Sequence, residues 1–219
     1  MKKLAIIFLF VATIVTSAVS EAQDIPSSSR SRAAISRVKL KLQGELSGAG
    51  FNWGMPIFVR IFKKTKELEI WLKDRKNFRL FKTYKICTYG WRSLGPKTKQ
   101  GDGRAPEGFY YVKPRQINPL SEFHLSFNLG YPNAYDRVNG RTGGALMVHG
   151  SCVSIGCYAM TDEGIEEIFT LADASLRNGQ RFFRVHIFPF RMTDKNMNEH
   201  KHSKCYKFWE NVKECYDFF

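Results

Sequence analysis

The chain has 219 residues, of which 43% are hydrophobic and 14% aromatic. This length and composition suit one sizeable folded domain with appendages, and they exclude an intrinsically disordered protein. The formal net charge is +14 at pH 7. Because the basic residues are spread along the chain rather than gathered in arms, the charge favours an anionic cell-envelope partner over nucleic acid.

The first 22 residues have the pattern of a secretory signal. Lys2 and Lys3 form a basic start, residues 4–15 are nearly all apolar, and small residues at Ser20 and Ala22 suit cleavage after Ala22. The apolar run of about a dozen residues is shorter than the roughly 20 that span a bilayer. We therefore expect an exported protein of the periplasm or cell envelope that has no membrane span once the signal is removed.

Residues 23–50 combine a Ser-rich linker with a predicted helix. Apolar residues recur about every four positions over 32–46, which is typical of an amphipathic helix, and Gly48 or Gly50 would end it.

From Pro56 onward the period changes to that of strands. Apolar runs bounded by turn residues predict strands at 57–62, 68–72, 78–87, 109–112, 123–129, 145–148 and 182–188. The first three, joined by short turns, predict a meander. Two long loops separate later strands: residues 90–108 follow the third strand, and residues 130–144 follow the strand at 123–129. These loops are candidates to form the walls of a groove.

Helices are expected after residue 160 and near the C-terminus. Thr161 can cap a helix that Gly179 would stop, and a further helix is predicted over about 203–216. The expected architecture is therefore mainly β, with one helix after Cys157 and helices at both ends.

A His–Cys pair with flanking glycines is the strongest chemical signal. His149 ends a predicted buried strand, and Cys157 follows Gly156 eight positions later. A thiol becomes a good nucleophile when a base lies within hydrogen-bond reach. Backbone N–H groups from Gly156 to Tyr158 could face a developing oxyanion.

The other cysteines and histidines have structural interpretations. An odd total of five Cys leaves at least one thiol unpaired in an oxidising compartment, and the pairing of Cys87, Cys152, Cys205 and Cys215 stays open. Cys205 and Cys215 can pair only if one straight helix does not separate them, since ten helical residues span about 15 Å. Cys152 has His-x-x-Cys spacing to His149, but no further zinc ligands are apparent, so neither a metal nor a cofactor is expected and Cys152 is interpreted as structural.

His124 and His186 are interpreted as satisfied strand residues, and His200 and His202 as solvated.

The exact string resembles a known family. His149-Gly150, Ser154, Gly156-Cys157 and Met160, preceded by Gly101-Asp102, Pro106, Gly108 and Tyr110, resemble the L,D-transpeptidase catalytic domain (YkuD-like) of bacterial cell-wall enzymes. The runs 127–137 and 94–97 look like its YafK-like murein transpeptidase subgroup. The resemblance covers about residues 51–190, which would form the catalytic domain, with 191–219 as a C-terminal helical extension.

The resemblance implies a mostly β fold, a β-sandwich or barrel, with a Cys nucleophile and a His base facing a groove. Carried over, Cys157 is the nucleophile and His149 the base, while the Gly150 carbonyl orients the imidazole and Ser154 and Gly156 shape the turn.

Two positions depart from the family pattern. Many members carry a His two residues before the Cys and an Arg two residues after it, where this chain has Ile155 and Ala159. A basic partner for a substrate carboxylate must then come from elsewhere, and the candidates are Lys97, Arg104, Arg137 and Arg141.

The resemblance implies acyl transfer on peptidoglycan stem peptides, in cell-wall biogenesis and cell shape. Cys157 would form a thioester at the diaminopimelate carbonyl, and an amine would resolve it. Hydrolysis is the alternative, at a stem-peptide link or at the link between murein and an attached lipoprotein. An alternative of another class is a non-catalytic murein-binding module, favoured if His149 and Cys157 lie beyond hydrogen-bond range with the thiol sealed.

Overall fold

The computed structural model describes residues 24–92 and 94–219. It contains a five-stranded sheet, order β3-β2-β1-β9-β4, and a four-stranded sheet, order β5-β6-β7-β8, which we call sheet A and sheet B. The strands of sheet A are β1 (Ile57–Phe62), β2 (Glu67–Asp74), β3 (Asn77–Lys85), β4 (Gly108–Val112) and β9 (Phe183–Phe188). Those of sheet B are β5 (Ile117–Asn118), β6 (Ser126–Asn128), β7 (Met147–His149) and β8 (Tyr158–Ala159).

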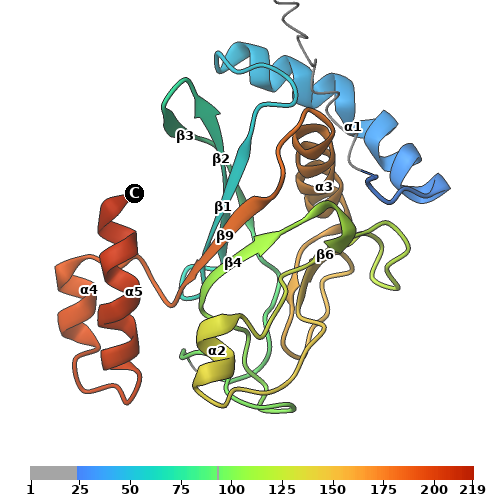
Figure 1. The fold of residues 1–219 in the computed structure, drawn as a ribbon. Helices are drawn as coiled ribbons and strands as arrows, with labels where there is room; N and C mark the ends of the chain where they lie inside the picture. The colour runs from blue at the N-terminus through green and yellow to red at the C-terminus, as the bar shows by residue number, and fades with distance from the viewer. Residues whose placement is uncertain (1–23, 93) are drawn as a thin grey trace, which may run out of the picture.

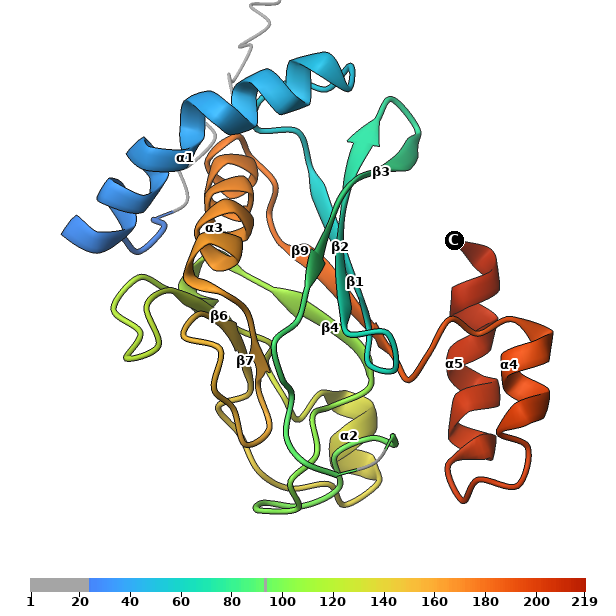
Figure 2. The same ribbon diagram turned by 180° about the vertical axis from the view of Figure 1, so that it is seen from behind.

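Sheet A is the central layer, and it is covered on both faces (Figures 1 and 2). The meander β1-β2-β3 is antiparallel as predicted, whereas β1 pairs with β9 in parallel. All six residues of β1 are buried. Because side chains alternate between the faces of a strand, burial of all six residues, Arg60 included, means that β1 is covered on both sides.

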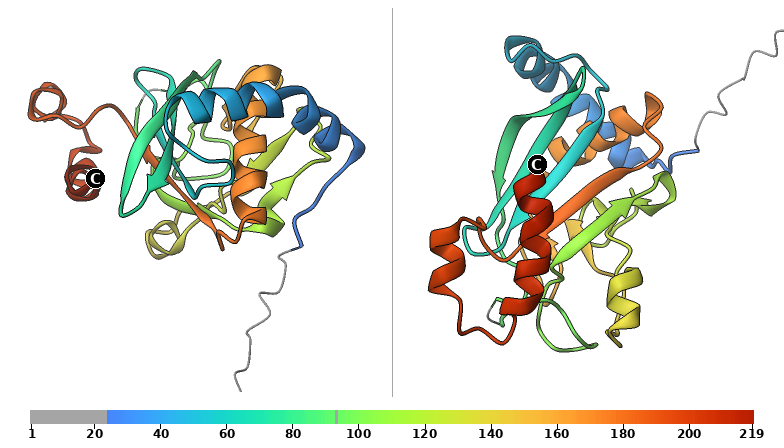
Figure 3. Two further views of the ribbon diagram at one scale, coloured as in Figure 1. Left: turned by 90° about the horizontal axis from the view of Figure 1, so that it is seen from above. Right: turned by 60° about the vertical axis from the view of Figure 1, so that its left-hand side comes forward.

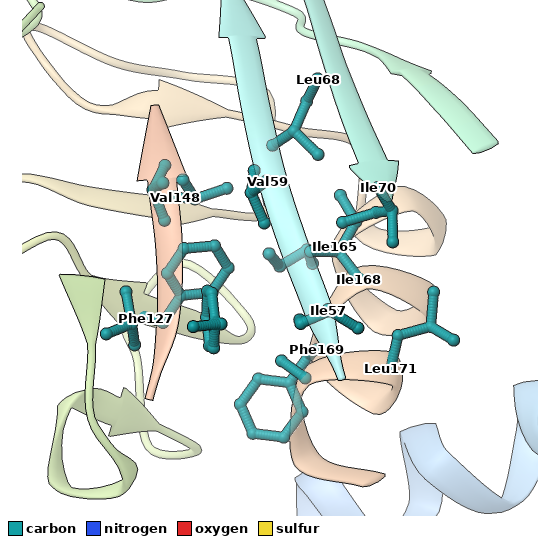
Figure 4. Packing of buried hydrophobic residues seen from close by; sticks show 14 of the residues in the cluster. Ile57, Val59, Leu68, Ile70, Phe127, Val148, Ile165, Ile168, Phe169 and Leu171 are labelled. Atoms are coloured by element: carbon teal, nitrogen blue, oxygen red, sulfur yellow. The ribbon is translucent and has the colours of Figure 1, made fainter. Parts of the chain in front are cut away.

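The helix α3 (Asp162–Arg177) covers one face of sheet A. It begins as the sequence predicts, since the Thr161 side chain accepts a hydrogen bond from the Gly164 N–H. Ile165, Ile168 and Phe169 of α3 pack in one core with Ile57 and Val59 of β1 (Figure 4). Helix α1 (Ser29–Gly48) lies across α3 (Figure 3) and adds Ala34, Val38, Leu42 and Leu46 to the same core.

Sheet B has one face in the main core and a second face, which we call its outer face, that is partly covered: Ser126, His149 and Ala159 are buried there, whereas Asn128, Met147 and Cys157 are partly exposed. Its register aligns Ile117, Phe127, Val148 and Tyr158 across the four strands, and all four are buried. Phe127 and Val148 point into the core in Figure 4. Their neighbours along each strand must then point to the other face, which is where the candidate site lies.

A helical hairpin covers the second face of sheet A. It consists of α4 (Asp194–Glu199) and α5 (Tyr206–Phe218), which stand beside β9 in Figure 1. Trp209 and Val212 of α5 form a second core with Phe62, Phe188 and Phe190. The hairpin is therefore packed against the sheet rather than trailing from it.

Several predictions of local structure need correction. The strand expected at 123–129 is confined to β6, because residues 123–125 leave the ladder and His124 has a φ of 65°. The strand expected at 145–148 begins later and includes His149. The short elements α2 (Ala134–Val138), η1 (Pro114–Gln116), β5, β8 and α4 are absent from the predictions.

The predicted signal at residues 1–22 lies outside the described residues. Among residues 24–92 and 94–219, the structure has no helix that combines the length and apolarity of a membrane span.

Candidate active site

Strand pairing brings His149 and Cys157 to the same face of sheet B. The parallel pair β7–β8 aligns Val148 with Tyr158 and His149 with Ala159, which sets Met147 opposite Cys157. Residues two apart on a strand share a face. His149 and Cys157 are therefore diagonal neighbours on the outer face, a relation that brings side chains within reach of each other.

His149 is held in a defined orientation. Its Nδ1 lies 2.6 Å from the Gly150 carbonyl oxygen, so Nδ1–H donates and the neutral ring keeps Nε2 as its acceptor. The half-exposed Phe123 ring packs on the imidazole with centroids 4.7 Å apart. Burial lowers the pKa of His149, and the hydrogen bond to Gly150 partly opposes that shift.

The Cys157 thiol is half-buried. The Met147 N–H donates to Sγ at 3.4 Å, and Sγ lies 3.7 Å from the Ala145 carbonyl oxygen. Burial raises the pKa of Cys157, while the Met147 N–H and the positive charge of Lys97 lower it. No hydrogen bond joins Cys157 to His149, both of which the structure describes; in unliganded sites such bonds are often long and tighten with substrate.

Ser154 organises the turn before Cys157. Its hydroxyl donates to the Cys157 carbonyl at 2.8 Å and accepts from the Gly156 N–H at 3.0 Å. The Gly156 N–H, one of the predicted oxyanion donors, is thus already engaged. The Tyr158 N–H lies on the β7 side of the parallel β7–β8 ladder, because the next N–H, of Ala159, points away to Thr88 and that of Met160 returns to the His149 carbonyl. The Cys157 N–H therefore remains from the predicted set.

Gly150 lies where a side chain has no room. A Cβ there would come 2.6 Å from Asp162 Oδ1 and 3.0 Å from Ile165 Cγ2. The same Asp162 oxygen accepts from the Ser151 N–H at 2.8 Å. Asp162 therefore holds the backbone that follows His149.

A disulfide anchors the loop from the other side. Cys87 and Cys152, 65 positions apart, are bonded, and this bond leaves Cys152 unavailable as a zinc ligand. The Cys87 N–H also donates to the Ala159 carbonyl at 2.9 Å. Cys157, Cys205 and Cys215 are free thiols, and the continuous helix α5 explains why the last two do not pair.

Two of the four candidate basic residues are neutralised. Lys97 pairs with Asp102 at 2.8 Å, and Arg141 pairs with Asp136 at 2.7 Å; all four side chains are less than a tenth exposed. Arg141 also lies over the Phe208 ring. These two cations serve the folding of their loops.

The remaining two candidates differ in position. Arg104 lies close to Gly95, and its carbonyl is 3.5 Å from where a Cβ of Gly156 would stand. Arg137 lines a groove of about 680 Å³, and so does Arg115, which the sequence analysis did not single out. Met147, the neighbour of Cys157, lines the same groove.

Of the other histidines, His124, His186 and His200 contact protein groups, and His202 is exposed as predicted. The prediction that His200 is solvated is wrong, because its ring stacks on Phe190. His124 Nε2 lies 2.8 Å from Glu166 Oε1, which also receives Arg37. Burial, aided by nearby arginines, lowers the pKa of His186 to about 3. Within the part of the chain that the structure describes, no cluster of three or more His, Cys, Asp or Glu could hold a metal ion.

Comparisons with known proteins agree on one family. The family model of the L,D-transpeptidase catalytic domain (YkuD) matches residues 57–187. Over 166 residues the chain is 49% identical to the protein named "Putative L,D-transpeptidase YafK" of Escherichia coli strain K12, covering 76% of this chain and 67% of that protein. The protein of the same name from Escherichia coli O157:H7 matches equally.

Among solved structures, a variant of the helical cell shape determining protein Pgp2 from Campylobacter jejuni is similar in fold. The TM-score is 0.51 at 20% sequence identity, over 77% of this chain and 58% of that chain. The chain thus spans less than two thirds of the length of Pgp2.

Proposed function

The chain belongs to the L,D-transpeptidase catalytic domain (YkuD) family, and we propose that it is an exported cysteine acyl-transferase that acts on peptidoglycan stem peptides. The observation that carries the proposal is the placement of Cys157 and His149 on one face of sheet B, beside a groove. The imidazole already presents Nε2 as a base, because Nδ1 is engaged by the Gly150 carbonyl.

The reaction begins with proton transfer from the Cys157 thiol to His149 Nε2. Sulfur then attacks the carbonyl carbon at the L-centre of diaminopimelate and forms a tetrahedral oxyanion. The C–N bond to D-alanine breaks, and His149 returns the proton to the leaving amine. An acceptor amine, deprotonated by His149, attacks the thioester and releases the Cys157 thiol.

A backbone amide stabilises the oxyanion. The Cys157 N–H is the proposed donor, since the Gly156 N–H already donates to Ser154 and the Tyr158 N–H faces β7. One such donor typically contributes about 3 kcal/mol to transition-state stabilisation. Ser154 and Gly150 act indirectly, by fixing the turn and the imidazole.

Hydrolysis of a link between murein and an attached lipoprotein is the second candidate. The loop leading to Cys157 exposes Val153 and Ile155, and Trp91 is exposed nearby, beside the close approach of Gly90 to Gly156. Apolar side chains exposed together suit contact with a polypeptide better than contact with a charged muropeptide. Water would then resolve the thioester.

The experiment is incubation of purified sacculi with the protein, followed by mass analysis of the released and residual muropeptides. New diaminopimelate–diaminopimelate dimers identify the transferase, whereas loss of lipoprotein remnants identifies the hydrolase. Cys157→Ala should abolish either change, and Cys205→Ser, which removes another free thiol, should not.

A non-catalytic murein-binding module is the competing hypothesis. It is favoured if His149 and Cys157 lie beyond hydrogen-bond range and the thiol is sealed. The first condition is met, since no hydrogen bond joins these two described residues. The second is not, since Cys157 is only half-buried. Sacculi that emerge unchanged from incubation with a folded protein that still binds them would favour the module.

A further inference from the structure

The groove beside Cys157 has an unusual chemical lining. It contains two arginines, Arg115 and Arg137, four side-chain amides and no carboxylate. The amides are Gln116, Asn118, Asn128 and Asn133. A concave surface with cations and without acids attracts anionic ligands and concentrates them.

The groove lining includes a residue that contacts Cys157. Asn128 and Met147 are register partners on β6 and β7, and both line the groove. The Met147 N–H is 3.4 Å from Cys157 Sγ. Met147 therefore links the groove lining to the contacts of the thiol.

The two arginines of the groove come from different elements. Arg115 is in η1, and Arg137 is in α2, which lies below the end of β4 in Figure 2. The Arg137 Nη1 donates to the Pro132 carbonyl at 2.5 Å, which holds the guanidinium in place. Planar guanidinium groups bind carboxylates through paired hydrogen bonds.

The amides add donors for a peptide backbone. The side-chain oxygens of Asn118 and Asn128 accept from the N–H groups of Leu120 and Gly130. Their NH₂ groups are then available to donate to ligand carbonyls. The lining fits a short peptide that bears free carboxylates.

We infer that this groove binds the acyl-donor stem peptide, with Arg115 and Arg137 as the residues that recognise its carboxylates; the inference rests on the proposed function. The two arginines would bind the substrate carboxylates in place of the His and Arg that many family members carry near the Cys. Ile155 and Ala159 cannot do so, since Ile155 is apolar and exposed and Ala159 is fully buried. Neither Lys97 nor Arg141 is available, because each is paired with an aspartate.

The test is a calorimetric titration of Cys157→Ala protein, which cannot turn over its ligand. The probes are the acidic stem tetrapeptide L-alanyl-γ-D-glutamyl-diaminopimelyl-D-alanine and its analogue with all carboxylates amidated. Adding Arg115→Gln or Arg137→Gln should each weaken binding of the acidic peptide about tenfold, the usual size for a lost charge-assisted contact. Binding of the amidated analogue should be weak and equal in all variants.

Arg75→Gln is the matched control, because it removes the same charge from the exposed β2–β3 turn; it should bind like the parent. Arginine variants that bind the acidic peptide as tightly as the parent would overturn the inference, as would a parent that does not bind it or does not prefer it to the amidated form.

Sacculus digestion with the active protein separates the two proposals. If the protein is active on sacculi but binds the acidic and amidated peptides equally, the proposed function holds and this inference fails. If the protein prefers the acidic peptide but is inactive on sacculi, the groove binds the stem peptide as inferred and the proposed catalysis fails.

Discussion

Burial sets the resting protonation of both reactive side chains. It raises the pKa of the Cys157 thiol and lowers that of the His149 imidazole. Between those two pKa values the site contains a neutral thiol beside a neutral base, not a preformed thiolate–imidazolium pair. Proton transfer is then part of the chemical step, and it requires the thiol to turn from Ala145 toward His149.

This protonation state predicts the pH dependence of alkylation. With Cys205 and Cys215 both changed to Ser, the rate of Cys157 alkylation by iodoacetamide should rise with a midpoint above the ordinary thiol pKa of about 8.5. The rate is measured by mass spectrometry of the labelled protein. A midpoint near pH 5 or 6 would instead indicate the ion pair.

The lowered pKa of His149 predicts the pH dependence of turnover at low pH. The base must be neutral, and the pKa of His149 is lowered, so the acid limb of kcat/KM on muropeptides should have its midpoint below the ordinary His value of about 6.5. An acid limb centred above pH 7 would contradict this assignment of the base.

The lack of space at Gly150 predicts how a single added methyl group there affects activity. In Gly150→Ala the new methyl group must displace the Asp162 carboxylate, only 2.6 Å away, and with it the backbone that orients His149. A misplacement of about 1 Å commonly costs roughly 100-fold in rate, and we expect kcat/KM to fall by about that factor. Gly144→Ala is the control, since no heavy atom lies within 4 Å of its added Cβ; equal activity of the two variants would refute the steric account.

At the scale of elements, the short strand β8 is supported from both flanks. On one flank β7 pairs with it, and on the other the residues after β3 pair through the Thr88–Ala159 bridge and the Cys87–Cys152 disulfide. A two-residue strand has little ladder of its own, so its position depends on these long-range contacts.

Removing the disulfide should therefore destabilise the whole fold. For a loop of this length the chain-entropy model gives about 4 kcal/mol, so Cys87→Ser with Cys152→Ser should lower the free energy of unfolding in urea by about that amount. Cys205→Ser, which breaks no bond, should change it little. Equal stability of the double variant and the parent would show that the bond adds nothing to the fold.

At the scale of the whole molecule, α5 contacts both loops that flank the site. Trp209 Nε1 donates to Glu107 at 2.8 Å, and Glu107 also pairs with the fully buried Lys63 and accepts from the Gly95 N–H. One residue earlier, Phe208 packs on Tyr135 of α2 with ring centroids 5.7 Å apart. The hairpin thus braces the loop of Lys97 and Arg104 as well as the groove wall that carries Arg137.

Trp209→Phe tests this brace. The ring is kept, but one oxygen of a buried carboxylate loses its donor, which typically costs about 1–3 kcal/mol. We expect that loss in urea unfolding, together with faster amide hydrogen exchange over residues 95–105. Trp53→Phe, at the other end of the molecule, is the control, and unchanged exchange in Trp209→Phe would refute the brace.

Much of this arrangement could be predicted from local patterns. The mostly apolar pattern of β1 and the Thr161 cap of α3 are visible in the sequence, and the spacing of His149 and Cys157 indicates the candidate site. Long-range pairing could not be predicted: the bond between Cys87 and Cys152, the neutralisation of Lys97 and Arg141, and the placement of Arg115 all depend on tertiary contacts. β5 and β8 are two residues long, too short to show a period.

The disulfide has a further consequence for preparing the protein. Cys152 and Cys157 lie on the same loop, so during oxidation Cys87 has two nearby partners, and bonding to Cys157 would consume the proposed nucleophile. The product with the Cys87–Cys152 bond and the product with a Cys87–Cys157 bond each contain three free thiols. Titration of total thiols therefore gives the same count for both products. Peptide mapping of alkylated Cys157 counts the competent ones, and specific activity should be normalised to that number.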